Sequence, residues 1–529
     1  MPAWLDIPEE HKRSRGYRFF EILPGALSYF ILLLPIILSF ISVTAAAFFI
    51  LAYILIYFTR SIAFDVRAFF GYREMRTQEK LDWNAMVEEV ERGEVNPEAK
   101  RPAWHRSNIE RLSETPSIVA PHEIVHAVII ATYNESREVL EPTIRSVLNS
   151  DFDKKKIIFV LAYEARAGEK IEKQANDLVE EFGGNFLHAM AVKHPANMVG
   201  EIIGKGGNIS YAGRELAKYL EQAKIDPKNV VVTTLDADNR PAKQYFAGLT
   251  YLYSVVPDPI RASYQPLPMY TNNIWDAPAP MRVIATGNTF FYFVLSQRPH
   301  LQRNFSAHAQ SMRALIDMDF WSVRSIVEDG HHFWRSYFFY DGNYRVYPLT
   351  IPIYQDAVLA EGYVKTLKAQ FIQMRRWTYG ASDIAYMAYE GFFRKNKVPR
   401  GDLISKFLRT LEGHVTWATG APLLLYAAFV PVMFNPQNYA ANELPIIISR
   451  IQTLGLIGLS ASLFVALKTL PPRPARYKRR RTIFMILQWF YLPVTTLCYG
   501  AAAALYSQTR LMFAKYLSFI VTVKAVKED

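Results

Sequence analysis

The hydrophobic pattern divides the chain into long apolar runs toward both ends and an alternating segment between them. Residues 22–59 contain no charged side chain. As one helix this run would measure about 57 Å, nearly twice the roughly 30 Å hydrocarbon core of a bilayer, so we predict a transmembrane hairpin. Further apolar runs predict two transmembrane helices within 415–470, with an interfacial helix before them at 401–414.

In the segment 121–400, short runs rich in valine and isoleucine alternate with stretches whose apolar residues have helical spacing. The strand-like runs are 124–131, 157–162, 186–192 and 230–235. Alternating strands and helices predict an α/β domain with a mostly parallel sheet and helices on both faces. Because such sheets bind ligands beyond the carboxyl ends of their strands, the residues that follow these runs are candidates for a binding site.

The charged positions set the expected orientation in a membrane. The formal net charge is +11 at pH 7, and basic residues flank both ends of 22–59 and fill the loop 471–481. Basic loops stay on the cytoplasmic side, so we expect a multi-pass protein of the plasma (inner) membrane. The α/β domain, the N-terminal residues 1–21 and the C-terminal tail 514–529 would then be cytoplasmic.

The same charges indicate which partners to expect. Anionic membrane lipids suit basic residues that lie beside the spans, whereas a nucleic-acid partner is not expected, because these residues do not alternate with aromatic side chains. The segment 60–120 is charged and interrupted by prolines, which predicts a cytoplasmic linker outside the domain core.

Two carboxylates directly follow the strand-like run 230–235. Asp236 and Asp238 would turn toward one point beyond the sheet. Oxygen ligands at such a point suit Mg²⁺ or Mn²⁺ carrying a diphosphate. A solvated turn or a helix cap explains two aspartates at this spacing as well, and the position at a strand end favours the metal interpretation.

A second acidic pair, Glu328 and Asp329, precedes two histidines. A carboxylate at the start of a loop can reach a sugar hydroxyl while it stays ionised, so Asp329 is our candidate general base. The alternative is a pair of surface acids that opens a helix. We expect His331 and His332 to be structural, because no third metal ligand follows at a suitable spacing.

Gln373, Arg376 and Trp377 are spaced to share one face of a predicted helix. An arginine can hold a leaving diphosphate and a tryptophan can stack on a sugar ring. An amphipathic helix lying on the membrane is the alternative. Lys205 precedes two glycines, which fits a phosphate contact and an exposed turn equally well.

In order and identity these motifs resemble those of family 2 glycosyltransferases with the GT-A fold, specifically the membrane-embedded cellulose-synthase-like and hyaluronan-synthase-like enzymes. Thr132-Tyr133-Asn134-Glu135 is similar to their first nucleotide loop, Asp236-Ala237-Asp238 to their metal motif and Glu328-Asp329 to their acceptor-base motif. Gln373-Met374-Arg375-Arg376-Trp377 matches QxxRW, and Phe519-Ile520-Val521-Thr522-Val523-Lys524 matches the FxVTxK gating loop of bacterial cellulose synthases. The resemblance covers about residues 20–525.

The resemblance implies a GT-A domain inserted between transmembrane helices, with a metal at Asp236 and Asp238. The implied donor-binding residues are Thr132, Tyr133, Glu135, Glu164, Lys205, Asp236, Arg376, Thr522 and Lys524. Glu328, Gln373 and Trp377 are the implied acceptor-binding residues. A gating tail must reach this site, so we predict that 482–513, which Pro493 interrupts, is interfacial or re-entrant rather than a fifth full span.

The chain departs from the family pattern at several points. Tyr163-Glu164-Ala165-Arg166 stands where adjacent aspartates are usual, so Glu164 would replace the aspartate that contacts the nucleobase. Val327 replaces the usual threonine before the acidic pair. The two late spans of cellulose synthase and a PilZ-like domain are missing, so additional subunits would have to complete a translocation path.

The leading functional hypothesis is an inverting, metal-dependent transferase that moves a sugar from a nucleotide-sugar, with a UDP-sugar as the expected donor, to a growing glycan. Processive polysaccharide synthesis would be one form of this reaction. A second hypothesis is the addition of one sugar to a lipid-linked acceptor. A third is a membrane subunit that binds nucleotide or glycan without turnover.

Overall fold

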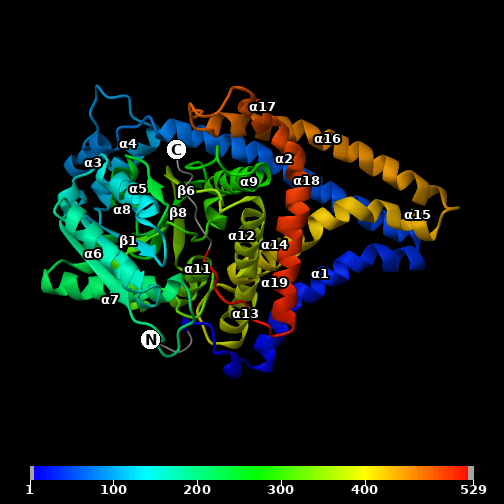
Figure 1. Ribbon diagram of the computed structural model, residues 1–529, viewed down its shortest axis with the longest axis horizontal. Helices are drawn as coiled ribbons and strands as arrows, with labels where there is room; N and C mark the ends of the chain where they lie inside the picture. Colours follow the sequence, from blue (N-terminus) through cyan, green and yellow to red (C-terminus); the bar gives the residue numbers. More distant parts are fainter. Residues whose placement is uncertain (1–4, 522–529) are drawn as a thin grey trace.

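The computed structural model describes residues 5–521 and shows an α/β domain from which several long helices project (Figure 1). The motif residues Thr522 and Lys524 therefore lie outside the described residues. The domain is built on one eight-stranded sheet with the order β3-β2-β1-β4-β7-β6-β8-β5. Its strands are β1 (Val125–Thr132), β2 (Ile157–Glu164), β3 (His188–His194), β4 (Val230–Asp236), β5 (Arg240–Pro241), β6 (Ala262–Met269), β7 (Ala309–Ser311) and β8 (Arg345–Tyr354).

The sheet is mixed and mostly parallel. β1 pairs in parallel with β2 and β4, β2 with β3, and β6 with β8. β7 is antiparallel to both of its neighbours, and the short β5 is antiparallel to β8. The four strand-like runs of the sequence correspond to β1–β4, so the predicted α/β architecture is confirmed.

Helices cover both faces of the sheet, and β1 shows why a strand can be apolar on both of its sides. Val128 and Ile130 pack in one cluster with α5 (Arg137–Leu148), α6 (Glu169–Gly183) and α8 (Tyr245–Val255). Ala127 and Ile129 pack on the opposite face with α7 (Lys205–Gln222). Successive side chains of a strand point to opposite faces, so a strand covered on both sides has no polar alternation.

The segment 60–120, predicted as a linker outside the core, instead contributes to the core. It contains α3 (Trp83–Arg92) and α4 (Ala103–Glu114), and Trp83, Met86 and Ile109 are buried in the same cluster as β1. The ring of His105 is buried between Glu89 and Tyr251, with 2.8 Å from each ring nitrogen to its partner oxygen. Glu88, Glu91 and Arg92 of α3 lie on its exposed face, which explains why the segment appears polar in the sequence.

Two helices form the predicted N-terminal hairpin. α1 (Arg15–Ile41) and α2 (Val43–Gln78) meet at Ser42, whose hydroxyl accepts a hydrogen bond from the backbone N–H of Ala45 at 3.3 Å. α2 continues well past residue 59 and packs against α9 (Ala279–Ser296) of the α/β domain. A Cβ at Gly71 would lie 2.3 Å from the backbone oxygen of Phe293, so glycine permits this close approach.

The interfacial helix predicted at 401–414 is not a separate element. Residues 400–426 form one helix, α14 (Arg400–Tyr426), followed by α15 (Val430–Phe434), because the stretch 400–421 contains no proline to interrupt it. α16 (Tyr439–Thr469) returns beside α2. This pair corresponds to the two helices expected within 415–470.

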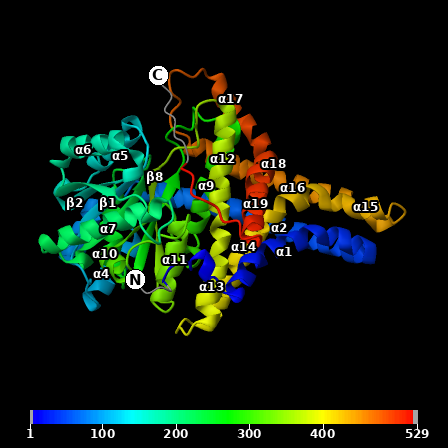
Figure 2. The ribbon, with the colours of Figure 1, turned by 60° about the horizontal axis from the view of Figure 1, so that its bottom comes forward.

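Five helical stretches of the described chain are long and apolar enough to cross a membrane: Arg15–Ile41, Val43–Gln78, Arg400–Phe434, Tyr439–Thr469 and Arg480–Met512. In Figures 1 and 2, α1, α2 and α16 project away from the α/β domain. The last stretch, which runs from α17 (Arg480–Leu487) through α18 (Leu492–Thr495) to α19 (Ala502–Met512), crosses their direction. It packs beside α12 (Tyr363–Thr378), where Thr378 Oγ1 lies 3.0 Å from Ser507 Oγ. Its interfacial or re-entrant course stays a prediction.

Candidate active site

The carboxyl ends of three parallel strands bring separate motifs to one edge of the sheet. Ala131 of β1 pairs with Asp236 of β4, and Thr132 of β1 pairs with Tyr163 of β2. Because these strands run in the same direction and in this register, Thr132, Glu164 and Asp236 all lie at the edge where ligands of parallel sheets bind.

Asp236 has two close polar partners at this edge. Its Oδ1 accepts a hydrogen bond from Lys205 Nζ at 2.6 Å, and its Oδ2 accepts one from the Ser306 hydroxyl at 2.6 Å. Asp238 is more enclosed, with 5% of the residue exposed, and its Oδ2 accepts from the backbone N–H of Asp356 at 3.0 Å. Residues 236–239 form a turn, but Asp238 is enclosed within it and Asp236 is held by Lys205 and Ser306.

The donor set of this edge fits a divalent cation that also binds substrate phosphates. The described residues contain no group of three or more His, Cys, Asp and Glu side chains that could enclose a metal by themselves. Mg²⁺ is commonly held by one or two carboxylates, with substrate phosphates and water completing its shell. The Asp236 side chain, 34% exposed, offers hard oxygen ligands of that kind.

Lys205 is the first residue of α7 and lies in the site rather than in an exposed turn. Burial acts to lower the pKa of Lys205, but the carboxylates of Asp236, Glu328 and Asp329 outweigh it, so its pKa is raised. The next residue must be glycine, because a Cβ at Gly206 would lie 2.1 Å from the backbone oxygen of Ser322. An ammonium group at a helix N-terminus is a favourable place for a phosphate.

The acidic pair opens α11 (Glu328–Phe339) and is partly enclosed. Burial, and then the charge of Asp329, raises the pKa of Glu328 to about 7. Burial also raises the pKa of Asp329, and the charges of Lys205 and Arg376 oppose the rise. Asp329 Oδ1 accepts from the backbone N–H of Gly330 at 2.7 Å. The pair thus opens a helix, as the alternative supposed, but it does so facing other charged groups and not at the outer surface.

The two histidines that follow hold α11 in place. Both are fully buried, and His331 Nδ1 lies 2.8 Å from Asp383 Oδ1. His332 forms a hydrogen bond through Nε2 with Gln310 of β7. These contacts give the histidines the structural role that the sequence predicts.

α12 brings Arg376 and Trp377 to the same region, and the C-terminal tail reaches it too. The guanidinium carbon of Arg376 lies 4.8 Å from the centre of the Phe519 ring. The same ring is 3.7 Å from the point where a Cβ at Gly204 would stand, just before Lys205. Phe519 therefore bridges α12 and the start of α7. Gln373 is half-buried, and its Oε1 accepts from Gln370 Nε2 at 3.2 Å.

Two tyrosines that the sequence did not single out complete the acidic region. The Tyr270 ring is 6.3 Å from the Trp377 ring, centre to centre. Burial raises the pKa of Tyr270 and of Tyr292, and the charges of Asp236 and Asp329 raise both further. Both hydroxyls thus lie near the acids and stay protonated. Buried tyrosines are common in cores, so no sequence pattern distinguishes these two from the rest.

Glu135 holds the loop after β1 through hydrogen bonds within that loop. The Thr132 hydroxyl and the backbone N–H of Tyr133 both donate to Glu135 Oε2, each at 2.8 Å. Beside it, the Glu164 carboxylate accepts two hydrogen bonds from Arg166, whose guanidinium carbon lies 4.0 Å from the centre of the Tyr133 ring. Arg166 was not predicted as a site residue, although its position two residues after Glu164 was a usable signal.

The segment before α1 contacts the loop that leads to the acidic pair. The Asp6 carboxylate accepts from the Ser322 hydroxyl and from the backbone N–H of Val323, the latter at 3.2 Å. The backbone oxygen of Leu5 accepts from Arg335 of α11 at 2.6 Å. These contacts join residues more than three hundred positions apart, which no local sequence pattern could reveal.

The start of α1 also holds the tail. Glu21, with 2% of its side chain exposed, pairs with Arg13 at 2.8 Å and with Arg18, and it accepts from the Tyr516 hydroxyl at 3.1 Å. Arg18 further donates to the backbone oxygens of Leu511 and Met512 at the end of α19. The position of Phe519 therefore depends on a buried ionic cluster from the other end of the chain.

Glu21→Gln should release the tail. Removing one charge of a buried pair costs about 3–5 kcal/mol, because its partners stay buried without compensation. Trypsin cleavage after Lys515, in the exposed turn beyond α19, should then be about tenfold faster or more. Glu361→Gln, in an exposed pair with Lys365, is the matched control and should cleave like the parent. Equal cleavage of all three proteins would show that Glu21 does not hold the tail.

Comparisons with known proteins give only distant similarities. No protein-family model matches the chain, and no curated protein matches it. A mannosyltransferase from Pyrobaculum calidifontis in complex with GDP-Man and Mn²⁺ is 14% identical, covers 86% of this chain and 100% of its own, and has a TM-score of 0.41. S. aureus TarS 1-349 in complex with UDP-GlcNAc is 11% identical over 75% of this chain and 94% of its own, with a TM-score of 0.37.

GalNAc-T7 with UDP, GalNAc and Mn²⁺ is 12% identical over 55% of this chain and 58% of its own, with a TM-score of 0.32. All three TM-scores are below 0.5, so these similarities carry no argument about substrate or mechanism. The site must be interpreted from the residues of this chain.

Proposed function

We propose that the protein is an inverting, metal-dependent glycosyltransferase that uses a nucleotide-sugar, with a UDP-sugar as the first candidate, at the cytoplasmic face of the plasma (inner) membrane. One observation carries the proposal: charged residues of β4, α7, α11 and α12 act on one another in one place. Lys205 contacts Asp236 directly, and the charges of Lys205, Arg376 and Asp236 all act on Asp329. The order of the motifs along the chain supports the same reading.

The residues divide into groups that face a donor and groups that face an acceptor. Lys205 and Arg376 would hold the two phosphates of the nucleotide, since cations compensate the charge that develops on a leaving diphosphate. Asp236 and Asp238 would hold Mg²⁺ or Mn²⁺, which when bound neutralises the same diphosphate. Asp329 would accept the proton of the acceptor hydroxyl as that oxygen attacks the anomeric carbon. A single displacement of this kind inverts the anomeric configuration.

The nucleobase would lie at the ends of β1 and β2. Arg166 stacks on Tyr133 at 4.0 Å and neutralises Glu164, so these three side chains form one flat, polar wall. Thr132 and Glu135 shape the loop on which Tyr133 stands. Thr522 and Lys524 would close over the nucleotide beyond Phe519, as the sequence motif implies.

The acceptor side is aromatic. Trp377 and Tyr270 present rings near the acid pair, and flat rings suit the apolar faces of a pyranose. Glu328 and Gln373 would supply hydrogen bonds to sugar hydroxyls. This arrangement favours a glycan acceptor, with addition of one sugar to a lipid-linked acceptor as the second candidate.

A panel of nucleotide-sugars tests the proposal. Purified protein in detergent should release nucleotide from one donor in the presence of Mg²⁺ or Mn²⁺ and an acceptor, and chelation should stop the release. A ladder of long products would identify chain extension, and a single product size would identify one-sugar transfer. Nucleotide binding without release or transfer, across all donors and both metals, would contradict an enzyme and favour a binding subunit.

We expect kcat/KM to fall as the pH is lowered through about 7, the value to which burial and the charge of Asp329 raise the pKa of Glu328. A carboxyl with a raised pKa is a base only above that pKa, so the ionised pair is lost on the acidic side. Glu328→Gln removes one of two like charges and should shift the acidic limb to lower pH. A pH profile of kcat/KM with saturating metal measures both effects, and a limb that does not move in this variant would argue against the coupling.

A further inference from the structure

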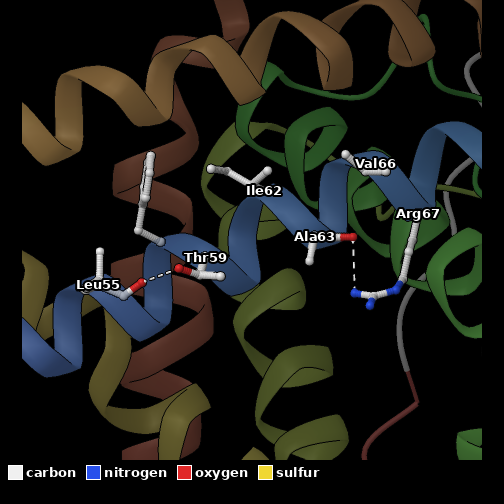
Figure 3. Close-up of a pocket in the computed structure, with 7 residues that line it drawn as sticks. Leu55, Thr59, Ile62, Ala63, Val66 and Arg67 are labelled. Atoms are coloured by element: carbon white, nitrogen blue, oxygen red, sulfur yellow. Dashed lines mark hydrogen bonds between the residues drawn. The ribbon is translucent and has the colours of Figure 1, made fainter.

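A groove on α2 has one apolar stretch and one basic end. It is lined by residues at helical spacing on a single face of α2, namely Leu55, Phe58, Thr59, Ile62, Ala63, Val66 and Arg67 (Figure 3). From the first to the last of these residues the groove is about 18 Å long, at 1.5 Å per residue. It lies apart from the candidate active site, since none of these residues contacts the acids there.

The apolar side chains of this groove are exposed. Leu55 is 55% exposed, Ile62 42% and Val66 49%. The one hydroxyl, that of Thr59, donates to the backbone oxygen of Leu55 at 2.8 Å. A surface of this kind offers a ligand no hydrogen bonds and gains only from contact with a hydrocarbon chain.

Four arginines from three parts of the chain gather beside this groove. Arg67 lines it, and Arg60 pairs with Glu412 of α14, one turn from Arg409. Arg298 follows α9, which packs on α2 where Phe293 meets Gly71. Burial and the charges of Arg67, Arg409 and Arg60 lower the pKa of Arg298. Mutual repulsion of this kind costs free energy unless an anion is present.

A carboxylate compensates only one of these four charges. Within residues 5–521 the four arginines make one ion pair, that of Arg60 with Glu412 of α14. The guanidinium group of Arg67 donates to the backbone oxygen of Ala63 at 3.3 Å, on its own helix (Figure 3). Four positive charges beside the groove are therefore matched by one negative charge.

We propose that this groove binds an anionic phospholipid, with one acyl chain along α2 and the lipid phosphate among Arg67, Arg298, Arg60 and Arg409. The combination selects the ligand class, because a free phosphate would leave the apolar stretch uncovered and a neutral lipid would leave the arginines uncompensated. Basic pockets beside transmembrane helices bind lipid phosphates in this way. The length of the groove matches a single acyl chain of ordinary length.

Lipid retention by the full-length protein tests this site. Protein purified in a nonionic detergent is mixed with micelles that contain phosphatidylglycerol or phosphatidylcholine, and the lipid that stays bound after repurification is measured. Phosphatidylglycerol should be retained at about one molecule per chain, and it should raise the thermal unfolding midpoint, because a ligand that binds only the folded state stabilises it. Arg67→Gln with Arg298→Gln should lower retention at least fivefold.

Two further variants separate the parts of the site. Arg92→Gln, in an exposed pair with Glu88 on α3, removes the same kind of charge elsewhere and should retain phosphatidylglycerol like the parent. Ala63→Trp should fill the groove and lower retention without touching the arginines. Unchanged retention in the double arginine variant, equal retention of phosphatidylcholine, or stabilisation by inorganic phosphate alone would each overturn the proposal. Preferential retention of a polyisoprenyl phosphate would overturn the assignment to a phospholipid.

Discussion

Asp329→Asn should lower kcat by about 10²–10⁴-fold, because a positioned general base contributes that much to a proton transfer. Asparagine keeps the shape of the side chain and can still face the backbone N–H of Gly330, but it cannot accept the proton of the acceptor hydroxyl. Nucleotide affinity should change little, since Asp329 faces the acceptor. Initial rates of sugar transfer and calorimetric binding of the nucleotide measure the two effects separately.

Asp317→Asn is the matched control for this variant. Asp317 ends α10 (Met312–Asp317) and pairs with Arg313 at a surface where the carboxylate is 34% exposed. Its replacement should leave kcat unchanged. If Asp329→Asn kept turnover within about threefold of the parent, the assignment of the base would be wrong, because such a small loss is below what a base contributes.

Asp236→Asn should lower kcat/KM by about 10²–10³-fold, since charge compensation by a bound cation supplies several kcal/mol and each 1.36 kcal/mol is a factor of ten in rate. The variant also removes the carboxylate that accepts from Lys205 at 2.6 Å. The concentration of Mn²⁺ that gives half-maximal rate should therefore rise together with the KM of the donor. Metal titrations of the initial rate measure this change.

The opposite end of the same strand provides the control. Asp226 lies just before β4, where it caps the turn Pro227–Asn229, and its side chain is 46% exposed. Asp226→Asn should leave both the metal dependence and kcat/KM unchanged. If Asp236→Asn had the same metal titration as the parent, this carboxylate would not be a metal ligand.

The sequence predicts the fold correctly where burial requires a run of apolar side chains. β1 is apolar from Ala127 to Ala131 because helices cover both of its faces, and Asp236 is the carboxylate at the end of the buried strand β4. Parallel strands then place their carboxyl ends at one edge without further information. That geometry alone suffices to bring Thr132 and Asp236 to the same edge of the sheet.

The sequence does not predict contacts between segments that lie far apart along the chain. α3 looks like a charged linker, because only Trp83 and a few other apolar residues on one face reveal its packing. The contacts of Asp6 with Ser322 and of Glu21 with Tyr516 join the two ends of the chain to the site. Lys205 is ambiguous in the sequence because a lysine before two glycines also suits a turn, and its hydrogen bond to Asp236 of β4 decides between them.

The position of a bound nucleotide tests the central claim most directly. A structure of the full-length protein with UDP and Mn²⁺ should show the diphosphate between Lys205 and Arg376, with an anomalous manganese peak beside Asp236 and the uracil near Tyr133. A nucleotide bound elsewhere on the molecule, or no bound nucleotide at saturating concentrations of several nucleoside diphosphates, would contradict it.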